Sequence, residues 1–262
     1  MTVLAKKMPA GEFTRKELMV VALARQVSDG MVCIAGTGLP LVGVTLAKLT
    51  HAPNSIIISE TGIIDGRLEH LPTGVSDTRF AYRASVWWPR YRYCGFLMKM
   101  PDKIDLGFLG GAQIDPYGNL NSTCIGDYYR PKARFTGSGG ANGIATNLNT
   151  VIIMQHEKRR FVEKVDYLTS PGWLGGPEGR RKAGLPENKG PVAVITTLGV
   201  MRFHPRTGRM YLGEYYQGVT PQEVIDHTGF SIDVSEAVEM EQPEASAIQL
   251  LRQKIDRDRI YI

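Results

Sequence analysis

The sequence lacks a long hydrophobic segment and has very few cysteines. No run of about 18 apolar residues, the length that spans a bilayer, occurs in the chain. Two lysines near the start are not followed by an apolar stretch, so no secretory signal is expected. The three cysteines, Cys33, Cys94 and Cys124, are far apart and form no C-x-x-C pair. Sparse, unpaired cysteines favour reduced thiols, and we therefore expect a cytoplasmic protein with no membrane partner.

The sequence also lacks the motifs of several common enzyme classes. Its five histidines have no metal-ligand spacing among themselves or with the cysteines, so no metal site is expected. Ser138 lies in Gly137-Ser138-Gly139 and not in a G-x-S-x-G elbow, which gives no support to a serine hydrolase. The glycine-rich run around it has neither the lysine of a P-loop nor the dinucleotide fingerprint. No permanently bound cofactor is expected.

Positive charge is in modest excess, with a net charge of +5 and a pI near 9.1. The charges are dispersed apart from two basic clusters at residues 156–160 and 180–182, and we interpret each cluster as solvated surface. A nucleic-acid-binding surface would instead show clustered Arg and Lys with interleaved aromatics. A mildly basic protein also suits a small polyanion, because phosphates need positive potential. The remote alternative is a non-catalytic binding subunit, for example one that binds nucleic acid.

Helices and strands alternate in the first part of the chain. Thr14 and Glu17 form a capping box, and apolar residues at helical spacing follow up to Gly30, which ends the helix. Residues 115–149 are rich in Gly, Asn, Ser and Thr, which indicates functional loops. The other expected elements are strands at 31–35, 56–59, 106–113 and 192–197, a helix ending near Thr50, a hairpin over 200–203 and 210–215, and helices starting near 220 and 243. This alternation predicts one α/β domain over residues 1–262, with an open, mostly parallel sheet and helices on both faces.

Glu60 is the first candidate for chemistry. It follows the buried strand expected at 56–59, and Thr61-Gly62 leaves little side-chain bulk behind it. Ligands of open α/β sheets gather outside the carboxyl ends of the strands, so a carboxylate here can point into a crevice. The alternative is a solvated carboxylate or a partner of a helix N-terminus, and position alone does not decide between them.

Two further candidates lie in the polar middle of the chain. Gln113 ends an expected strand, and its carboxamide can donate a hydrogen bond to a developing oxyanion. It can instead satisfy backbone groups of the loop that follows. In the run Thr136–Gly143, consecutive glycines allow backbone N–H groups to converge on a phosphate or an oxyanion. The alternative for this run is an ordinary tight turn.

Long strings of the sequence resemble the B subunits of glutaconate CoA-transferases, which are class I CoA-transferases. The resemblance is close from Gly107 to Phe161, through GGAQIDPYGNLNST, IGDYYRPKARFTGSGGANGIAT and MQHEKRRF. It extends more weakly over nearly the whole chain and includes GTGLP at 36–40, the Glu60-Thr61-Gly62 motif, YLTSPGWLGGPEG at 167–179 and HTGFSIDVSEAVE near the C-terminus. The family implies the CoA-transferase fold and a ping-pong transfer of CoA between carboxylic, glutaconate-like dicarboxylic acids.

The resemblance implies a role for each candidate. Glu60 matches the family's catalytic glutamate, whose attack on an acyl-CoA gives a mixed anhydride and then a glutamyl–CoA thioester. Gln113 and the backbone N–H of Gly140 match the family's oxyanion donors, and Gly139 and Ala141 are the alternatives if the alignment shifts by one. The residues expected in loops that contact substrate or CoA are Gly36, Thr37, Gly38, Gly137, Ser138 and Asn142. CoA is then a substrate and a transient covalent thioester.

The resemblance further implies that this chain is one half of a heteromer. The other half is an A-type (alpha) subunit, in an αβ heterodimer or a higher assembly such as (αβ)4. Trp87-Trp88 and the glycine-rich loops are candidates for the interface. Residues 63–70 depart from the family pattern, so the acid specificity stays open, with Arg67 or His70 as candidates to hold a second carboxylate.

Other activities occur on the same scaffold. Some relatives hydrolyse or decarboxylate CoA thioesters, or open rings in steroid catabolism, and they lack the glutamate in this subunit. The presence of Glu60 argues against them. A hydrolase that uses the glutamyl intermediate with water as the acceptor stays an alternative.

Overall fold

The computed structural model describes residues 13–88 and 101–262 of the chain. Its contacts separate into two compact units, one made of Met1–Leu106 with Met240–Ile262 and the other of Gly107–Glu239. The sequence predicts a single domain over residues 1–262. That prediction stands as a prediction, because compact contact units are not by themselves separate domains. No helix in the described ranges is long and apolar enough to span a bilayer.

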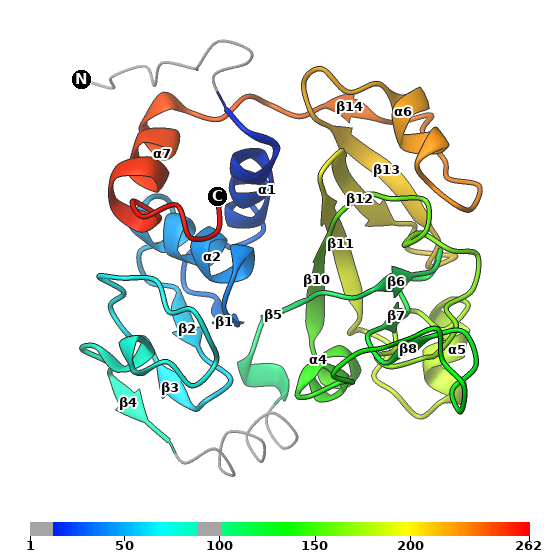
Figure 1. The fold of residues 1–262 in the computed structure, drawn as a ribbon, viewed down its shortest axis with the longest axis horizontal. Coiled ribbons are helices and arrows are strands. Elements are labelled where there is room, and N and C mark those ends of the chain that lie inside the picture. Colours follow the sequence, from blue (N-terminus) through cyan, green and yellow to red (C-terminus); the bar gives the residue numbers. More distant parts are fainter. Residues whose placement is uncertain (1–12, 89–100) are drawn as a thin grey trace. The chain divides into compact units, whose positions relative to one another are not determined.

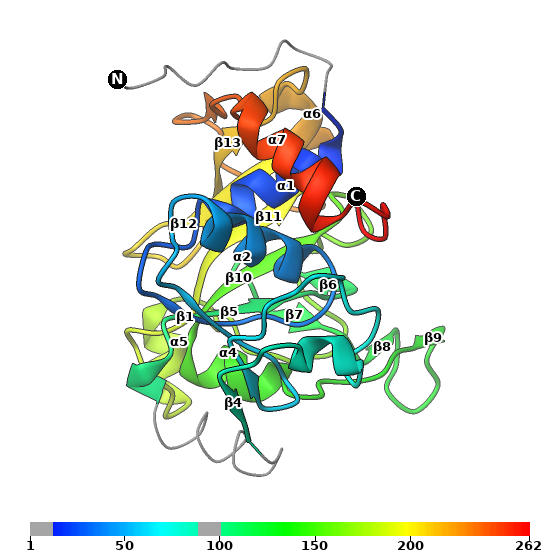
Figure 2. The same ribbon diagram turned by 90° about the vertical axis from the view of Figure 1, so that its left-hand side faces the viewer.

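The first unit packs its α-helices beside a short sheet (Figures 1 and 2). Its elements are α1 (Arg15–Ala24), β1 (Val32–Ile34), α2 (Leu39–Leu49), β2 (Ile56–Ile58), β3 (Ile63–Ile64), η1 (Thr78–Ala81), β4 (Val86–Trp87), η2 (Pro101–Lys103), α7 (Ala245–Leu250) and the π-helical η3 (Leu251–Ile255). β1 and β2 are parallel, whereas β2–β3 and β3–β4 are antiparallel. The β-α-β arrangement predicted from the sequence is therefore present.

Helix α1 begins as its sequence predicts and ends sooner. The Thr14 hydroxyl accepts from the Glu17 N–H at 3.2 Å and the Glu17 carboxylate accepts from the Thr14 N–H at 2.7 Å, so the capping box is confirmed. The predicted end at Gly30 is wrong, because the helix stops at Ala24. Beyond it the N–H groups of residues 26 and 27 bond carbonyls three residues back, which tightens the chain into turns.

The second unit is built on a longer mixed sheet. Its main strands lie in the order β14 (Val238–Glu239), β13 (Met210–Tyr215), β12 (Gly199–Phe203), β11 (Pro191–Thr196), β10 (Asn149–Met154) and β5 (Leu106–Leu109). The central pair β10–β11 is parallel, and β11 and β12 are antiparallel. β12 and β13 form the predicted antiparallel hairpin. Parallel strands in each unit, connected through helices, confirm the α/β class.

Smaller elements complete the second unit. They are β6 (Gln113–Ile114) with β7 (Leu120–Asn121), β8 (Cys124–Ile125) with β9 (Ala133–Arg134), and the helices α4 (Ala141–Asn147), α5 (Pro177–Lys182) and α6 (Pro221–Asp226). The single strand predicted over 106–113 is wrong, since it is split into β5 and β6 at Gly110-Gly111. A Cβ at Gly111 would lie 3.1 Å from the Leu120 side chain, so glycine allows the chain to pass close to β7 at this break.

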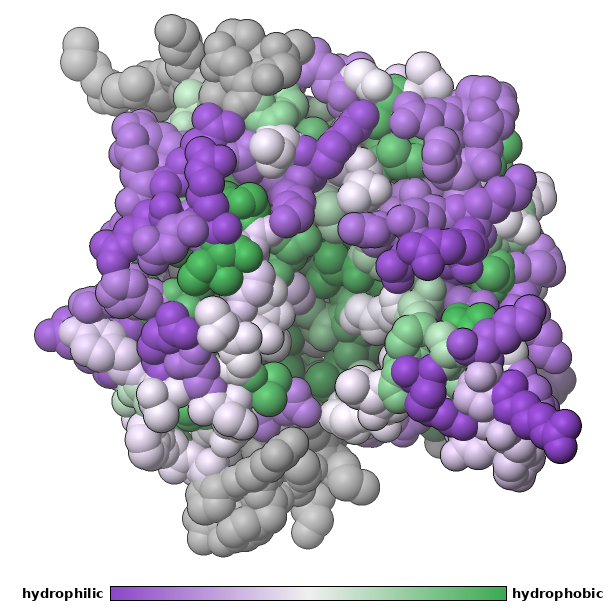
Figure 3. Space-filling model, in the orientation of Figure 1, coloured by the Kyte–Doolittle hydropathy of each residue, from purple (hydrophilic) through white to green (hydrophobic). Residues whose placement is uncertain are grey.

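The two basic clusters are not uniformly solvated. Charged and polar side chains cover much of the face seen in Figure 3, as dispersed charges predict. Arg180, however, is fully buried, and His156 is 4% exposed. For these two residues the interpretation as solvated surface is wrong, because their polar atoms find partners inside the second unit. Arg159, Arg181 and Lys182 are exposed as predicted.

Candidate functional site

Glu60 lies in the tight turn that joins β2 to β3. The Gly62 N–H donates to the Ser59 carbonyl at 3.0 Å, and the Ser59 N–H donates to the Ile63 carbonyl at 2.9 Å. These bonds close a three-residue hairpin loop whose first residue is the half-buried Glu60. A loop of this length favours a left-handed residue at its third position, and Gly62 supplies it with a φ of +87°.

Gly62 also fixes the turn through a close approach to Trp88. A Cβ at Gly62 would lie 2.3 Å from the Trp88 carbonyl oxygen, and the Trp88 N–H donates to the Gly62 carbonyl at 2.9 Å. The hydroxyl groups of Ser59 and Thr61 share a hydrogen bond of 2.8 Å under the turn. The backbone that carries Glu60 is therefore held from two sides.

The loop Gly36-Thr37-Gly38 lies at the same sheet edge as Glu60. It follows β1, the parallel neighbour of β2, and the Ala35 N–H donates to the Ile58 carbonyl at 3.1 Å. Carboxyl ends of parallel neighbours meet at one edge, which is where α/β proteins bind ligands. The structure thus brings together two of the segments singled out by sequence.

Tyr261 belongs to this edge too, although no sequence pattern singled it out. Its hydroxyl donates to the Pro72 carbonyl at 2.5 Å, and its oxygen also receives a hydrogen bond from the backbone of Gly38. Burial raises the pKa of Tyr261 above its ordinary value in spite of that bond. A neutral phenol therefore stands beside the loop, and only the fold reveals it.

A hollow of about 200 Å³ opens beside the Glu60 turn. The residues that line it are Thr61, Ile63, Ser76, Asp77, Thr78, Ala81, Trp87 and Trp88. Hydrogen bonds from the Arg79 side chain, at 2.9 Å for Nε, hold the pKa of Asp77 well below its usual range. One wall of the hollow thus carries the Asp77 carboxylate, which is held in place by its hydrogen bonds to Arg79.

Gln113 is buried in the second unit, and its carboxamide is engaged. Its Oε1 accepts from Asn121 Nδ2 at 2.7 Å and from the Asp166 N–H at 3.0 Å. Its Nε2 donates to Asp166 Oδ2 at 3.2 Å. Gln113 therefore satisfies polar groups of the surrounding chain, which is the alternative considered for it. An oxyanion would have to use the second N–H of the Gln113 amide.

The glycine-rich loop runs into the first turn of α4. Gly137 and Gly139 have φ values of +85° and +50°, conformations that favour glycine. The Ala141 N–H donates to the Ser138 carbonyl at 2.8 Å. Within the described ranges the N–H groups of Gly139 and Gly140 donate no hydrogen bond. Of the three amides considered, those two are free to meet a ligand.

A hydrogen-bond network joins the Gln113 region to this loop. Ser122, next to β7, accepts from the Gly137 N–H at 3.0 Å, and its hydroxyl donates to the Gly137 carbonyl at 3.0 Å. The Thr169 hydroxyl accepts from the Ser122 N–H at 2.9 Å, and the Thr169 carbonyl accepts from Asn142 Nδ2 at 3.0 Å. Sequence reasoning missed Ser122 and Thr169, because their partners are distant along the chain.

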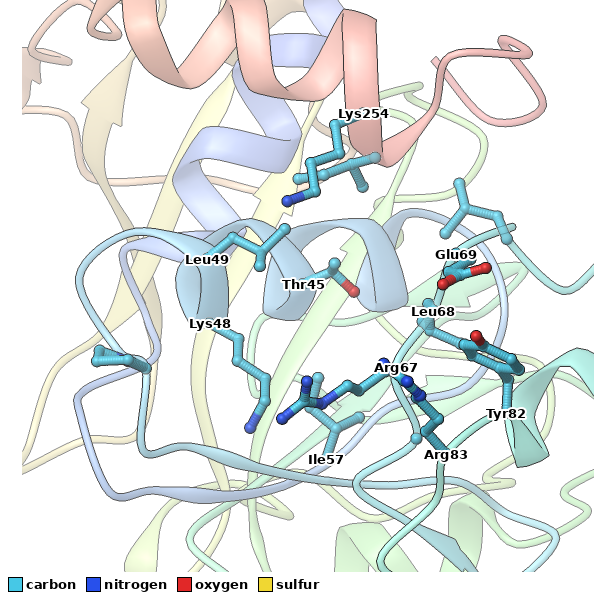
Figure 4. A pocket seen from close by; sticks show the side chains of 14 residues that line it. Thr45, Lys48, Leu49, Ile57, Arg67, Leu68, Glu69, Tyr82, Arg83 and Lys254 are labelled. Carbon is cyan, nitrogen blue, oxygen red and sulfur yellow. The ribbon is translucent and has the colours of Figure 1, made fainter.

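The residues considered for a second carboxylate lie away from the Glu60 turn. The Asp65 N–H donates to the Ile57 carbonyl at 2.7 Å, so the chain after β3 runs back along β2. Arg67 consequently lines a different hollow, shown in Figure 4. His70 is exposed and contacts the Arg257 guanidinium at 3.0 Å. Neither residue lines the hollow beside Thr61.

Comparison with known proteins gives a consistent picture. The family model for Coenzyme A transferase matches residues 16–227. The chain is 49% identical over 254 residues to the B subunit of glutaconate CoA-transferase from Acidaminococcus fermentans, covering 95% of each chain. It is 38% identical over 242 residues to the B subunit of 3-oxoadipate CoA-transferase from Pseudomonas knackmussii, covering 92% of each. The crystal structure of glutaconate coenzyme A-transferase from A. fermentans matches with a TM-score of 0.93, covering 96% of this chain and 98% of that chain at 49% identity. The resemblance and the fold class expected from the sequence are confirmed.

Proposed function

This chain belongs to the Coenzyme A transferase family, and from that premise we propose that it is the nucleophile-bearing subunit of a two-subunit enzyme that moves CoA between carboxylic acids. The observation that carries the proposal is the position of Glu60. It is the first residue of a hairpin loop held by Gly62, at the carboxyl edge of parallel strands, beside the Gly36–Gly38 loop. The edge of such a sheet is where a reacting carboxylate can meet a ligand.

The proposed reaction divides one acyl exchange into two reversible halves. The Glu60 carboxylate attacks the thioester carbonyl of the acyl-CoA, CoA thiolate leaves, and a mixed anhydride forms. The thiolate then attacks the glutamyl carbonyl, which releases the donor acid as its carboxylate and leaves a Glu60–CoA thioester. An acceptor carboxylate repeats these steps in reverse. Covalent catalysis of this kind replaces one difficult step with easier ones.

Each tetrahedral intermediate needs hydrogen-bond donors for its oxyanion. We assign this role to the N–H groups of Gly140 and Gly139 and to the second N–H of Gln113, since the Ala141 N–H is engaged by Ser138. The loop residues 36–38, 137, 138 and 142 would contact substrate or CoA. No metal or resident cofactor takes part in this scheme.

The proposed assembly has an A-type partner, as an αβ heterodimer or a higher form such as (αβ)4. The relatives named above are B subunits, and both names specify dicarboxylic acids, glutaconate and 3-oxoadipate. We therefore propose a dicarboxylic acid as the substrate class. Buried free thiols at Cys33 and Cys124 support a cytoplasmic location.

The test is to trap the covalent intermediate. The chain is co-expressed with its A-type partner, incubated with glutaryl-CoA or glutaconyl-CoA without acceptor, and treated with borohydride. Peptide mass spectrometry should find a reduced side chain at Glu60, and none in Glu60→Ala. Glu187→Ala, which removes an exposed carboxylate, is the matched control and should keep the reduction at Glu60.

An unmodified Glu60 in a complex that still consumes the acyl-CoA would contradict the transferase mechanism. Release of free acid without an added acceptor, at the rate of overall turnover, would instead identify the hydrolase alternative. Both outcomes are read from the same incubation.

A further inference from the structure

A second hollow in the first unit takes no part in the proposed reaction. Its volume is about 400 Å³, which is within the range of small-molecule sites (Figure 4). Apolar side chains form much of its lining, among them Ile57, Leu71 and Ile255, which are nearly buried. Leu49 and Tyr82, also in the lining, stay 45% and 43% exposed. The hollow therefore presents apolar surface that the described protein atoms leave uncovered.

Its charged side chains are mostly cationic. They are Lys48, Arg67, Arg83 and Lys254 against Glu69. Asp65 pairs with Lys48 at 2.8 Å, but Arg67 and Lys254 form no ion pair or side-chain hydrogen bond with any described residue. In Figure 4 the side chains of Lys48 and Arg67 extend toward each other, while Glu69 lies on another side of the hollow. The hollow therefore carries more positive charge than the described carboxylates beside it neutralise.

The cationic segments are held in place by their backbone. A Cβ at Gly66 would lie 2.1 Å from the Phe80 carbonyl, and the Arg67 N–H donates to the Tyr82 carbonyl at 2.8 Å. Asp65 and Arg83 adopt φ values of +55° and +51°, a costly conformation for residues other than glycine. Arg67 and Arg83 therefore project from two segments that are locked together.

We propose that this hollow binds an organic anion with an apolar body, either a carboxylate or a phosphate ester. The guanidinium of Arg67 can hold either head group through two parallel N–H bonds, with Lys254 and Arg83 adding positive potential. The apolar body would cover the exposed side chains of Leu49 and Tyr82. An inorganic anion would leave that apolar surface exposed, and a neutral ligand would leave the cations unpaired.

The site is distinct from the Glu60 turn. Ile58 pairs with Ile64, and the chain then continues to Arg67 past the amino end of β2, whereas Glu60 follows its carboxyl end. Binding here requires no covalent chemistry. Failure of this proposal would therefore leave the glutamyl mechanism untouched, and loss of the Glu60 intermediate would leave the anion site standing.

Isothermal titration calorimetry of the full chain with octanoate and with octyl phosphate tests the proposal. We expect one site per chain for at least one of them, and their relative affinities identify the head group. Arg67→Gln should weaken binding at least tenfold, and Lys254→Gln should weaken it less. Arg181→Gln, the same change at an exposed arginine of α5, should leave the affinity unchanged.

Titration with octanol tests the role of the cations, and titration with inorganic phosphate tests the role of the apolar surface. Binding of octanol as tight as that of octanoate would overturn it, because the cations would then contribute nothing. Inorganic phosphate that binds as tightly as octyl phosphate would overturn the role of the apolar surface. An unchanged affinity in Arg67→Gln would place the ligand elsewhere, and since Arg67 is exposed, this variant is expected to fold.

Discussion

Arg180 is a fully buried guanidinium whose hydrogen bonds go to backbone carbonyls. Its Nε donates to Pro186 at 2.9 Å, and its terminal nitrogens donate to Gly172 at 2.9 Å and to Thr146 at 2.8 Å. Burial lowers the pKa of Arg180 to about 10, which still keeps the side chain charged at neutral pH. Because Thr146 lies in the last turn of α4, this cation also complements the helix dipole.

We predict that Arg180→Met lowers the free energy of unfolding by about 3 kcal/mol, since several buried carbonyls lose their donor. Urea denaturation measures this loss. Arg181→Met, one residue further on at an exposed position, should change stability by less than about 0.5 kcal/mol. Equal losses in the two variants would contradict the assignment.

His156 is a buried neutral histidine. Its ring nitrogens bond the hydroxyl groups of Thr196 at 3.1 Å and Thr228 at 3.0 Å, and the ring stacks on Phe161. Burial, with a smaller repulsion from His227, lowers the pKa of His156 from 6.5 to about 3. Below pH 6.5, His156 therefore binds a proton in the unfolded chain but stays neutral in the folded chain until the pH approaches 3.

Stability from this residue is fully present above pH 6.5 and is lost as the pH falls toward 3. Between that upper value and about pH 5 we expect a loss of about 2 kcal/mol in the wild type. His156→Gln should flatten this slope. Urea titrations at the two pH values check the prediction, and a slope unchanged by the substitution would refute it.

At the scale of elements, the β2–β3 hairpin depends on a single glycine. Gly62→Ala would place a methyl group against the Trp88 carbonyl and force a left-handed φ on alanine. We expect a loss of about 1–3 kcal/mol in stability together with loss of borohydride-trapped Glu60. Gly74→Ala, where nothing lies within 4 Å of the added Cβ, is the control and should retain both. Full trapping in Gly62→Ala would show that the turn is not needed to position Glu60.

A second element-scale feature is the ion pair that connects α1 to η3. Glu17 is 2% exposed, and its carboxylate accepts from the Arg252 guanidinium at 2.6 and 3.0 Å. Burial would raise the pKa of Glu17, but the hydrogen bonds from Arg252 and Thr14 bring it below 4.5. The pair therefore stabilises the fold above that pH and loses its effect as the pH falls through the lowered pKa.

We predict that Arg252→Met costs about 3 kcal/mol at pH 7, because it leaves a buried carboxylate unpaired. The cost should shrink near pH 4, where the unpaired Glu17 can take up a proton. Chemical denaturation at both pH values measures the difference. A loss independent of pH would mean that packing, and not the charge, is what Arg252 contributes.

At the scale of the whole molecule, the proposed partner needs a surface on this chain. Trp87, which belongs to the segment expected at the interface, is 68% exposed and therefore does not lie in the core of this chain. We predict that Trp87→Ser leaves the unfolding free energy of the chain within about 0.5 kcal/mol but weakens its complex with the A-type subunit at least tenfold. Size-exclusion chromatography of the co-expressed pair measures the complex. Tyr129→Ser, at another exposed aromatic, serves as the comparison.

The sequence by itself determined the features that depend on neighbours along the chain. The Thr14–Glu17 capping box, the β12–β13 hairpin and the strand that precedes Glu60 all rest on residues a few positions apart. The strings shared with the CoA-transferases likewise indicate the family from the sequence alone. The same local reasoning made α1 too long, because apolar spacing continues past the point where the backbone tightens into turns.

Only the tertiary structure decided the roles of residues whose partners are distant in sequence. Arg180 and His156 looked like surface charge, and their burial follows from carbonyl and hydroxyl groups tens of residues away. Arg67 follows Glu60 closely in sequence, yet the antiparallel return of β3 carries it past the other end of β2. Local spacing records the period of a helix or strand, whereas the satisfaction of a buried polar group depends on which segments meet in space.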